Sequence, residues 1–314
     1  MAVMIVFLII GVVLLYFGAE LLVKGSANLA IKCGVSPLVA GLTVVAFGTS
    51  APELVVSIKA GFNGLGDIAV GNIVGSNIFN IAVILGISAM IRPLKVHLNV
   101  LRIDTPVMLA ASVSLMAILF DSKISRIEGI LLFAGIIFYV VFTVIAALRA
   151  GETKADFPVE QLIPDKKVNA VMDIIYVISG LGLLVVGSRF FVDGAVDLAR
   201  IIGVSEAIIG LTIVAAGTSL PELATSVIAA IKKEEDIAIG NIIGSNIFNI
   251  LAILGVSSTI TPLSSTGVDQ ISLYFMLGTA VILLPFMRTG FVLSRIEGFL
   301  LLAVYGGYMY YLWP

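Results

Sequence analysis

Residues 67–80 read DIAVGNIVGSNIFN, and residues 236–249 read DIAIGNIIGSNIFN. The same offset of 169 positions relates GTSAPE at residues 48–53 to GTSLPE at residues 217–222. About 32 of the 53 positions from residue 41 to residue 93 are identical to their counterparts, and the alignment needs no gap. Self-similarity at a fixed offset over so long a stretch indicates a tandem duplication. Polar residues are kept as well as apolar ones, which favours a preserved functional site.

The composition of the 314 residues indicates a membrane protein. Apolar residues make up 60% of the chain and charged residues 12%, and the mean hydropathy is +1.16. A soluble domain is about half apolar and about one quarter charged. The net charge of −2 provides no basic surface, which argues against nucleic acid as a partner. The single cysteine, Cys33, excludes an internal disulfide and any multi-cysteine metal site.

Ten apolar runs come close to the roughly 20 residues that a membrane-spanning helix needs. Five lie at 2–23, 37–62, 68–91, 105–120 and 127–148, and five lie at 168–191, 205–231, 237–260, 271–287 and 296–313. We therefore predict an all-α integral membrane protein with ten transmembrane helices. Its predicted units are a first five-helix repeat at 1–149, a linker at 150–167 and a second five-helix repeat at 168–314.

An odd number of spans in each copy makes the second copy enter the membrane from the opposite side. We expect two inverted repeats related by a pseudo-two-fold axis in the membrane plane. This architecture is typical of secondary transporters, whose ion site lies near the midplane. The 18 Lys and Arg residues divide about 13 to 5 between the two sides, and the linker lies on the richer side. The positive-inside rule then predicts a multi-pass cell-membrane protein with a cytoplasmic linker and both termini extracellular.

The second span of each copy is expected to break in its middle. Pro52 has no N–H, and its ring clashes with the carbonyl of Gly48, four residues back. Pro221 has the same relation to Gly217. Carbonyls freed at membrane depth are tolerated where they line a polar cavity. The oxygens predicted to line it are the carbonyls of Ala46, Thr49, Ala215 and Thr218 and the hydroxyls of Thr49, Ser50, Thr218 and Ser219.

Glu53 and Glu222 follow these breaks directly. A lone acid in a membrane span can serve as a helix–helix hydrogen bond, but two acids in matched breaks favour a binding site. Inverted symmetry brings them face to face, where two carboxylates about 5 Å apart repel by roughly 3 kcal/mol at an effective dielectric near 20. The pair should therefore hold a proton or cations. An all-oxygen cage suits Ca²⁺ or several Na⁺, and it lacks the nitrogen or sulfur that zinc prefers.

The third span of each copy supplies a polar face toward the break. Asn72, Ser76 and Asn80 are spaced i, i+4 and i+8, which places them on one side of a helix. Gly71 and Gly75 allow a second helix to approach closely, although this spacing alone indicates only packing. The second copy repeats the polar face at Asn241, Ser245 and Asn249.

At these two motifs the sequence resembles the calcium/cation antiporter superfamily, and in particular the compact prokaryotic sodium/calcium exchangers. Residues 48–53 with 71–80 look like the first alpha repeat of that family, and residues 217–222 with 240–249 look like the second. The resemblance covers nearly the whole chain. It implies ten helices, alternating access and exchange of Ca²⁺ against about three Na⁺.

The resemblance also implies a set of ion ligands. Its calcium site maps to Glu53, Glu222 and the backbone oxygens of Thr49 and Thr218. Its sodium sites map to Ala46, Ser76, Ala215 and Ser245, and Asn80 and Asn249 map to the middle of the site. Some relatives carry Asp where this chain has Asn249. With asparagine in both copies the cage holds two negative charges, which balance one Ca²⁺ or two Na⁺, and potassium dependence is not expected.

The predicted function is a secondary antiporter that exchanges Ca²⁺ for Na⁺, with no cofactor and no enzymatic activity. Its expected partners are the two transported ions and the lipid bilayer, and it is expected to work as a single chain. A Ca²⁺/H⁺ exchanger, in which protons replace Na⁺, remains an alternative. A passive cation channel is a further alternative, since oxygen cages suit channels too. An intramembrane hydrolase would need a base or nitrogen ligand in the membrane, and the single histidine, His97, lies in a predicted loop.

Overall fold

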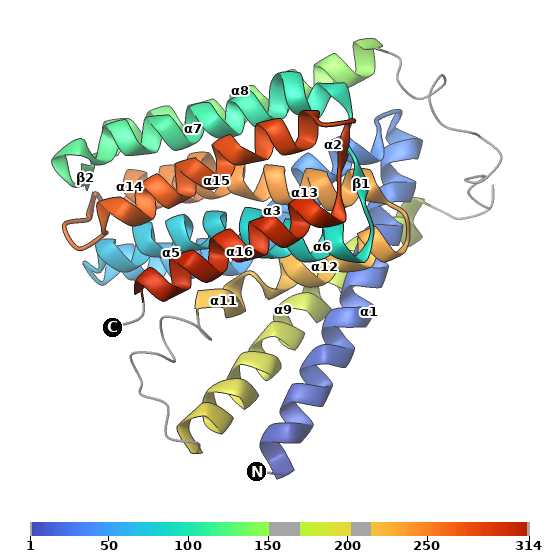
Figure 1. Cartoon of the computed structure of the whole chain (residues 1–314), viewed down its shortest axis with the longest axis horizontal. Coiled ribbons are helices and arrows are strands. Elements are labelled where there is room, and N and C mark those ends of the chain that lie inside the picture. Colours follow the sequence, from blue (N-terminus) through green and yellow to red (C-terminus); the bar gives the residue numbers. More distant parts are fainter. Residues whose placement is uncertain (1, 151–169, 202–214, 313–314) are drawn as a thin grey trace.

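A computed structural model describes residues 2–150, 170–201 and 215–312 (Figure 1). The predicted linker at 150–167 lies beyond the end of α8 and, apart from Ala150, outside the described residues. The start of the seventh predicted span, 205–214, also lies outside them.

Most of the described chain is helical, and its strands are four segments of two residues each. The first half forms α1 (Ala2–Cys33), α2 (Pro37–Ala40), η1 (Gly41–Val45), α3 (Ala46–Thr49), α4 (Ala51–Phe62), α5 (Gly66–Phe79), η2 (Asn80–Leu85), α6 (Gly86–Ile91), β1 (Leu94–Lys95), η3 (Val100–Asp104), α7 (Thr105–Ile118), η4 (Leu119–Asp121), β2 (Lys123–Ile124) and α8 (Arg126–Ala150). The second half forms α9 (Ala170–Ile201), α11 (Ala215–Thr218), α12 (Leu220–Ile231), α13 (Glu235–Phe248), η6 (Asn249–Leu254), α14 (Gly255–Ile260), β3 (Leu263–Ser264), α15 (Gln270–Arg288), β4 (Val292–Leu293) and α16 (Arg295–Leu312). Segments η1, η2, η3 and η6 are π-helical, and η4 is a 3₁₀ turn.

Seven helices of the described residues are long and apolar enough to cross a membrane. The bent pair Pro37–Thr49 and Ala51–Phe62 brings the number to eight if it counts as one span. The structure therefore belongs to a multi-pass membrane protein. The count does not confirm the prediction of ten spans. Helix α12 has only 12 residues, and α16 carries Arg295, Glu297 and several tyrosines in its 18 residues.

Each of the two small sheets joins a strand of one half to a strand of the other half. Strand β1 pairs antiparallel with β4, and β2 pairs antiparallel with β3. Adding 169 to the residue numbers of β1 and β2 gives those of β3 and β4, so the two small sheets are counterparts. Two copies related by a two-fold axis produce this exchange of equivalent contacts.

Helices α1 and α9 are counterparts that lie side by side in opposite directions (Figure 1). A Cβ atom at Gly11 would lie 2.9 Å from the carbonyl oxygen of Gly187, and one at Gly18 would lie 2.9 Å from that of Gly180. Residues later in α1 therefore contact residues earlier in α9, so the two helices run antiparallel. Small residues permit this close backbone approach.

The third span of each half lies at the centre of the fold. Residues 237–255 of the span Glu235–Ile260 are all buried, and Gly66–Ile91 is largely enclosed. Val3–Cys33, Arg126–Arg149 and Ala170–Ile201 lie at the periphery. The segments that carry the repeated asparagines and serines are therefore shielded from lipid by the other helices.

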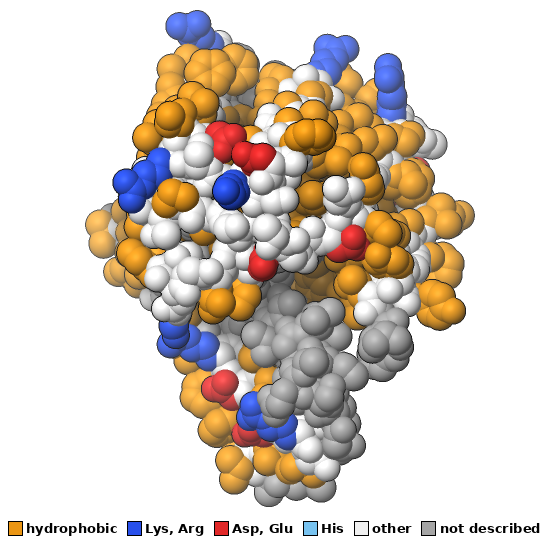
Figure 2. Space-filling model, turned by 90° about the vertical axis from the view of Figure 1, so that its left-hand side faces the viewer, with side chains coloured by type: hydrophobic (Ala, Val, Ile, Leu, Met, Phe, Trp, Pro, Cys, Tyr) orange, Lys and Arg blue, Asp and Glu red, His pale blue; other side chains and the backbone are white. Residues whose placement is uncertain are grey.

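The outer helices present hydrophobic side chains to their surroundings. Phe120, Phe138 and Ile296 are among the large apolar residues that are exposed. Figure 2 shows hydrophobic side chains over much of the molecule when it is viewed from one end. A soluble protein rarely exposes so much contiguous apolar surface, so lipid is the environment that this surface fits.

Candidate functional site

The first half contains a helix break directly before an acidic residue. Helix α3 ends at Thr49, Ser50 has φ −80° and ψ 8°, and α4 begins at Ala51. Pro52 occupies the second position of α4, where its missing N–H costs no helical hydrogen bond. The two segments meet at 45°, which confirms the predicted break in this copy.

The second half repeats the break at the equivalent position. Helix α11 ends at Thr218, Ser219 has φ −89° and ψ 9°, and α12 begins at Leu220. Pro221 again occupies the second helical position. The two breaks therefore have the same position in the repeat and nearly the same backbone geometry.

Glu53 and Glu222 lie in the first turns of α4 and α12, and both are fully buried. The Ser219 hydroxyl donates to Glu53 Oε1 at 3.0 Å, and the Ser50 hydroxyl donates to Glu222 Oε1 at 2.8 Å. A carboxylate is favoured in the first turn of a helix because of the helix dipole. The structure thus brings both acids and both serines to the place where the two breaks meet.

Asn72 and Asn241 connect the third span of each half to the break of the other half. The Thr49 hydroxyl donates to Asn241 Oδ1 at 3.1 Å, and the Thr218 hydroxyl donates to Asn72 Oδ1 at 3.5 Å. The Nδ2 groups of Asn72 and Asn241 donate to a serine hydroxyl of their own half at 3.2 and 2.9 Å. Each of these side-chain amides therefore forms hydrogen bonds through both its oxygen and its nitrogen. These bonds position the threonines and the helices that carry the two acids.

Asn80 and Asn249 begin the π-helical segments η2 and η6. Asn80 Nδ2 donates to Asn246 Oδ1 at 3.0 Å, and Asn249 Nδ2 donates to Asn77 Oδ1 at 2.9 Å. π-Helical turns inside α-helices are rare and occur frequently at functional sites. These two bonds fix the orientation of the amides of Asn80 and Asn249.

The remaining predicted residues lie beside the same crossing. Ser76 Oγ and Ser219 Oγ lie 3.2 Å apart, within hydrogen-bond distance, and Ser245 Oγ donates to the carbonyl oxygen of Ala46 at 3.5 Å. The Ala46 carbonyl also accepts the backbone N–H of Ser50 at 3.1 Å, so the break does not free it as the sequence predicted. The helical bond survives because the chain leaves helical geometry only at Ser50 itself. Ala215 begins α11, and its side chain lies outside the described residues.

Sequence reasoning missed four buried polar side chains in this network: Ser57, Asn77, Ser226 and Asn246. The hydroxyl oxygens of the two serines accept hydrogen bonds from the side-chain amides of Asn72 and Asn241. The missed asparagines donate to each other's carbonyl oxygens at 3.3 and 3.4 Å. Identity between the copies at an offset of 169 was the signal that could have found them. Asn77 follows Ser76 directly, so it lies off the helical face that Asn72, Ser76 and Asn80 share.

Four buried oxygen atoms in this network accept no hydrogen bond: Glu53 Oε2, Glu222 Oε2, Asn80 Oδ1 and Asn249 Oδ1. The two glutamate oxygens occupy equivalent positions in the two repeats, and so do the two asparagine oxygens. A buried acceptor without a donor costs about 1–3 kcal/mol, and more when it is charged. Among the residues that the structure describes, no three or more His, Cys, Asp or Glu side chains form a group that could hold a metal. The donor set is therefore made of oxygen atoms, which hard cations such as Na⁺ and Ca²⁺ prefer.

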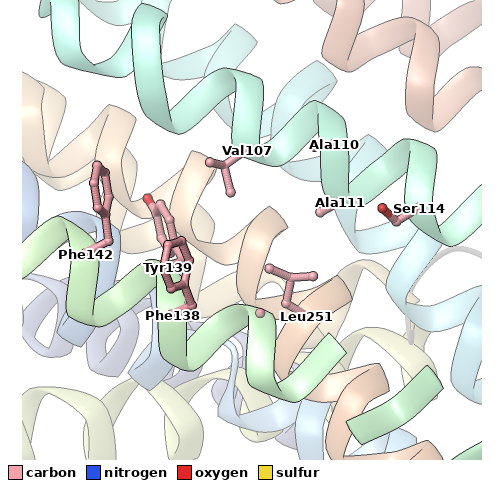
Figure 3. A pocket seen from close by; sticks show the side chains of 9 residues that line it. Val107, Ala110, Ala111, Ser114, Phe138, Tyr139, Phe142 and Leu251 are labelled. Atoms are coloured by element: carbon pink, nitrogen blue, oxygen red, sulfur yellow. The ribbon is translucent and has the colours of Figure 1, made fainter. Parts of the chain in front are cut away.

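A separate pocket of about 310 Å³ lies between α7 and α8 (Figure 3). Its lining is almost entirely apolar, and the Tyr139 hydroxyl donates to Asp104 at 2.9 Å. None of the predicted site residues lines it. It is lined by Val107, Ala110, Ala111, Ser114, Gly135, Phe138, Tyr139, Phe142 and Leu251.

Comparison with known proteins agrees with this geometry. The family described as sodium/calcium exchanger protein matches residues 3–146 and 172–313. The inner membrane protein YrbG of Escherichia coli strain K12 is 41% identical over 257 residues, which cover 81% of this chain and 79% of YrbG. The sodium/calcium exchanger MaX1 of Methanosarcina acetivorans is 34% identical over 339 residues, which cover 96% of both chains.

A solved structure is similar over almost the whole fold. The sodium-calcium exchanger NCX_Mj, in crystals soaked with zero Na⁺ and Ca²⁺, aligns with a TM-score of 0.85 and 32% sequence identity. The alignment covers 99% of this chain and 99% of the other. The family match spans both halves and leaves out mainly the region between them. The chain therefore belongs to the sodium/calcium exchanger protein family.

Proposed function

We propose that this chain is a secondary antiporter that exchanges Ca²⁺ for Na⁺ across the membrane by alternating access. The observation that carries the proposal is the set of four buried acceptor oxygens on Glu53, Glu222, Asn80 and Asn249 that receive no donor from the described residues. A cation bound between them would remove the cost of burying them unpaired. The names of MaX1 and NCX_Mj support Na⁺ and Ca²⁺ as the ions.

The coupling follows from charge balance. Two buried carboxylates are neutralised by one Ca²⁺ or by two Na⁺, and a third Na⁺ would leave one positive charge in the protein interior. An uncompensated charge in a membrane interior is costly. The carrier would therefore change between its inward-facing and outward-facing states only when the bound cations neutralise the two carboxylates. Ca²⁺ and Na⁺ use the same carboxylates, Glu53 and Glu222, so one Ca²⁺ and a full set of Na⁺ cannot be bound at the same time. Exchange rather than cotransport is the result.

The proposed ligand set is the one predicted from the sequence. Glu53, Glu222 and the oxygens of Thr49 and Thr218 would hold Ca²⁺. The hydroxyls of Ser50 and Ser219 orient the two carboxylates, and Asn72 and Asn241 position the helices behind them. Sodium would use the same acids together with Ala46, Ala215, Ser76, Ser245, Asn80 and Asn249.

The proposed architecture has ten spans in two inverted repeats, 1–149 and 168–314, joined by a linker at 150–167. The opposite directions of the counterpart helices α1 and α9 support this arrangement, since a two-fold axis that reverses a membrane-spanning helix must lie in the membrane plane. These two helices lie outside the centre of the fold and could slide as a gate past the site. The distribution of Lys and Arg supports a cytoplasmic linker and extracellular termini. The site lies within one chain, so the proposed working unit is a single chain.

Calcium uptake into proteoliposomes tests the proposal. Vesicles loaded with Na⁺ and diluted into Na⁺-free medium with radioactive Ca²⁺ should accumulate it, whereas vesicles loaded with choline should not. The internal and external pH are held equal with buffer and a protonophore. Uptake that ignores the Na⁺ gradient and follows an imposed pH difference would instead establish a Ca²⁺/H⁺ exchanger. Ohmic, gradient-independent current in a planar bilayer would establish a channel.

A further inference from the structure

A second pocket, of about 600 Å³, lies where several spans end. The candidate span Gly66–Ile91 ends at it, and the span Glu235–Ile260 begins at it. It therefore lies at the boundary between lipid and water, away from the buried acids. Elements of both halves contribute to it. Its lining residues are Ile91, Arg92, Pro93, Lys95, Ala230, Ile231, Glu235, Val292 and Arg295.

The pocket carries an excess of positive charge. Arg92 Nε pairs with Glu235 Oε1 at 2.8 Å, and the backbone N–H of Lys95 donates to Glu235 Oε2 at 3.3 Å. Both oxygens of the only acid in the lining are therefore occupied. Within the described part of the chain, neither the Lys95 ammonium nor the Arg295 guanidinium forms an ion pair. Three cations against one carboxylate leave a charge of +2.

Apolar side chains stand beside these cations. Ile91 and Ile231 are 41% and 56% exposed, although each ends a membrane-embedded helix. Cations alone would suit any soluble anion, and an apolar hollow alone would suit any acyl chain. A ligand with a negative headgroup and an apolar tail matches both at once. Basic pockets between transmembrane helices bind anionic lipid headgroups in this way.

We propose that this pocket binds one anionic phospholipid, with its phosphate between Lys95 and Arg295 and an acyl chain against Ile91 and Ile231. Lys95 belongs to β1 of the first half, and Arg295 begins α16 of the second half. The bound headgroup would therefore bridge the two halves beside the β1–β4 pairing, where Lys95 lies opposite Val292. The proposal does not depend on which ions are transported.

Native mass spectrometry of the full chain in a neutral detergent tests this site. Titration with phosphatidylglycerol should give one tightly bound lipid, and phosphatidylcholine should not compete. A cation near an anionic lipid surface contributes about 1 kcal/mol, so Lys95→Gln and Arg295→Gln should each weaken binding about fivefold. The double variant should weaken it roughly twenty-fivefold if the two effects add. Lys95→Arg should retain binding, which separates the loss of charge from a loss of folding.

Arg126→Gln is the matched control. Arg126 is the counterpart of Arg295 in the first repeat, it is exposed, and its loss changes the net charge equally. This variant should keep the tight lipid. Equal binding of phosphatidylcholine, an unchanged affinity in the double variant, or an equal loss in Arg126→Gln would overturn the proposal. Displacement of the lipid by millimolar glycerol phosphate would overturn it too, because the site would then belong to a soluble anion.

Discussion

The Ser50 hydroxyl donates a hydrogen bond to Glu222 Oε1 at 2.8 Å, so the helix break of one half holds the acid of the other. Ser219 and Glu53 form the same contact in reverse at 3.0 Å. Each carboxylate keeps one oxygen bonded to a serine and the other without a donor among the described residues. The serines thereby decide which oxygen of each acid is available to a cation.

Removal of either hydroxyl should weaken Ca²⁺ binding. A hydrogen bond to a charged group contributes about 1.5–3 kcal/mol, so Ser50→Ala and Ser219→Ala should each raise the Ca²⁺ concentration for half-maximal uptake roughly tenfold or more. The two effects should be similar, because the contacts are counterparts. Ser114→Ala, at an exposed position on α7, is the control and should leave uptake unchanged. A normal half-saturation in both site variants would show that the carboxylates need no such orientation.

Neutralising either acid should have a larger effect. One unit charge about 4 Å from another contributes roughly 4 kcal/mol at an effective dielectric near 20, which is about a thousandfold in affinity. Glu53→Gln and Glu222→Gln, made separately, should therefore abolish measurable Na⁺-driven Ca²⁺ uptake. Both proteins should still elute as folded monodisperse species in detergent, because glutamine keeps the size of the side chain. Robust uptake by either variant would place the ion site elsewhere.

The hydrogen bonds between the third spans should contribute to both protein stability and ion binding. They join Asn77, Asn80, Asn246 and Asn249. Asn246→Ala removes the acceptor of the Asn80 amide and the donor to the Asn77 carbonyl, all of them buried. Unsatisfied buried groups cost about 1–3 kcal/mol each, so thermal unfolding in detergent should shift down by several degrees. The loss of this bond should also misplace the Asn80 amide and raise several-fold the internal Na⁺ concentration that gives half-maximal Ca²⁺ uptake. Asn63→Ala, at an exposed helix end, is the control and should change neither property.

These residues mark the limit of what the sequence could predict. Pro52 acts on its own helix, so the break beside it follows from local chemistry and was predictable. Glu53 and Glu222 stood out because an acid inside an apolar run is costly. The bond between Asn80 and Asn246 depends on how two distant helices rotate against each other, and no local pattern specifies that rotation. The predicted number of ten spans is not confirmed for a similar reason, since length and hydropathy do not decide whether a short helix such as α12 is part of a broken span.

Close contact between α1 and α9 provides a matched pair of glycine substitutions. A Cβ atom at Gly180 would lie 2.7 Å from Leu22 N and 2.8 Å from the carbonyl oxygen of Gly18, whereas one at Gly182 would meet nothing within 4 Å. Gly180→Ala forces the two backbones apart, and overpacking of this kind typically costs about 1–3 kcal/mol. It should lower the unfolding temperature and slow exchange if the helices move as a pair. Gly182→Ala should be neutral or slightly stabilising, and equal effects of both substitutions would argue against the close contact.

The loop between α12 and α13 should make stability depend on pH. Burial, and to a smaller extent repulsion by Asp236, raises the pKa of Glu234 above its ordinary value of 4.5, although Lys232 opposes the shift. The folded protein therefore holds the proton more tightly than the unfolded chain, and stability present below pH 4.5 is lost as the pH rises through the folded pKa. Glu234→Gln should raise the unfolding temperature at pH 7, and this gain should shrink toward zero at pH 4. A gain of equal size at both values, or a loss at pH 7, would mean that the Glu234 carboxylate is not destabilised by its surroundings.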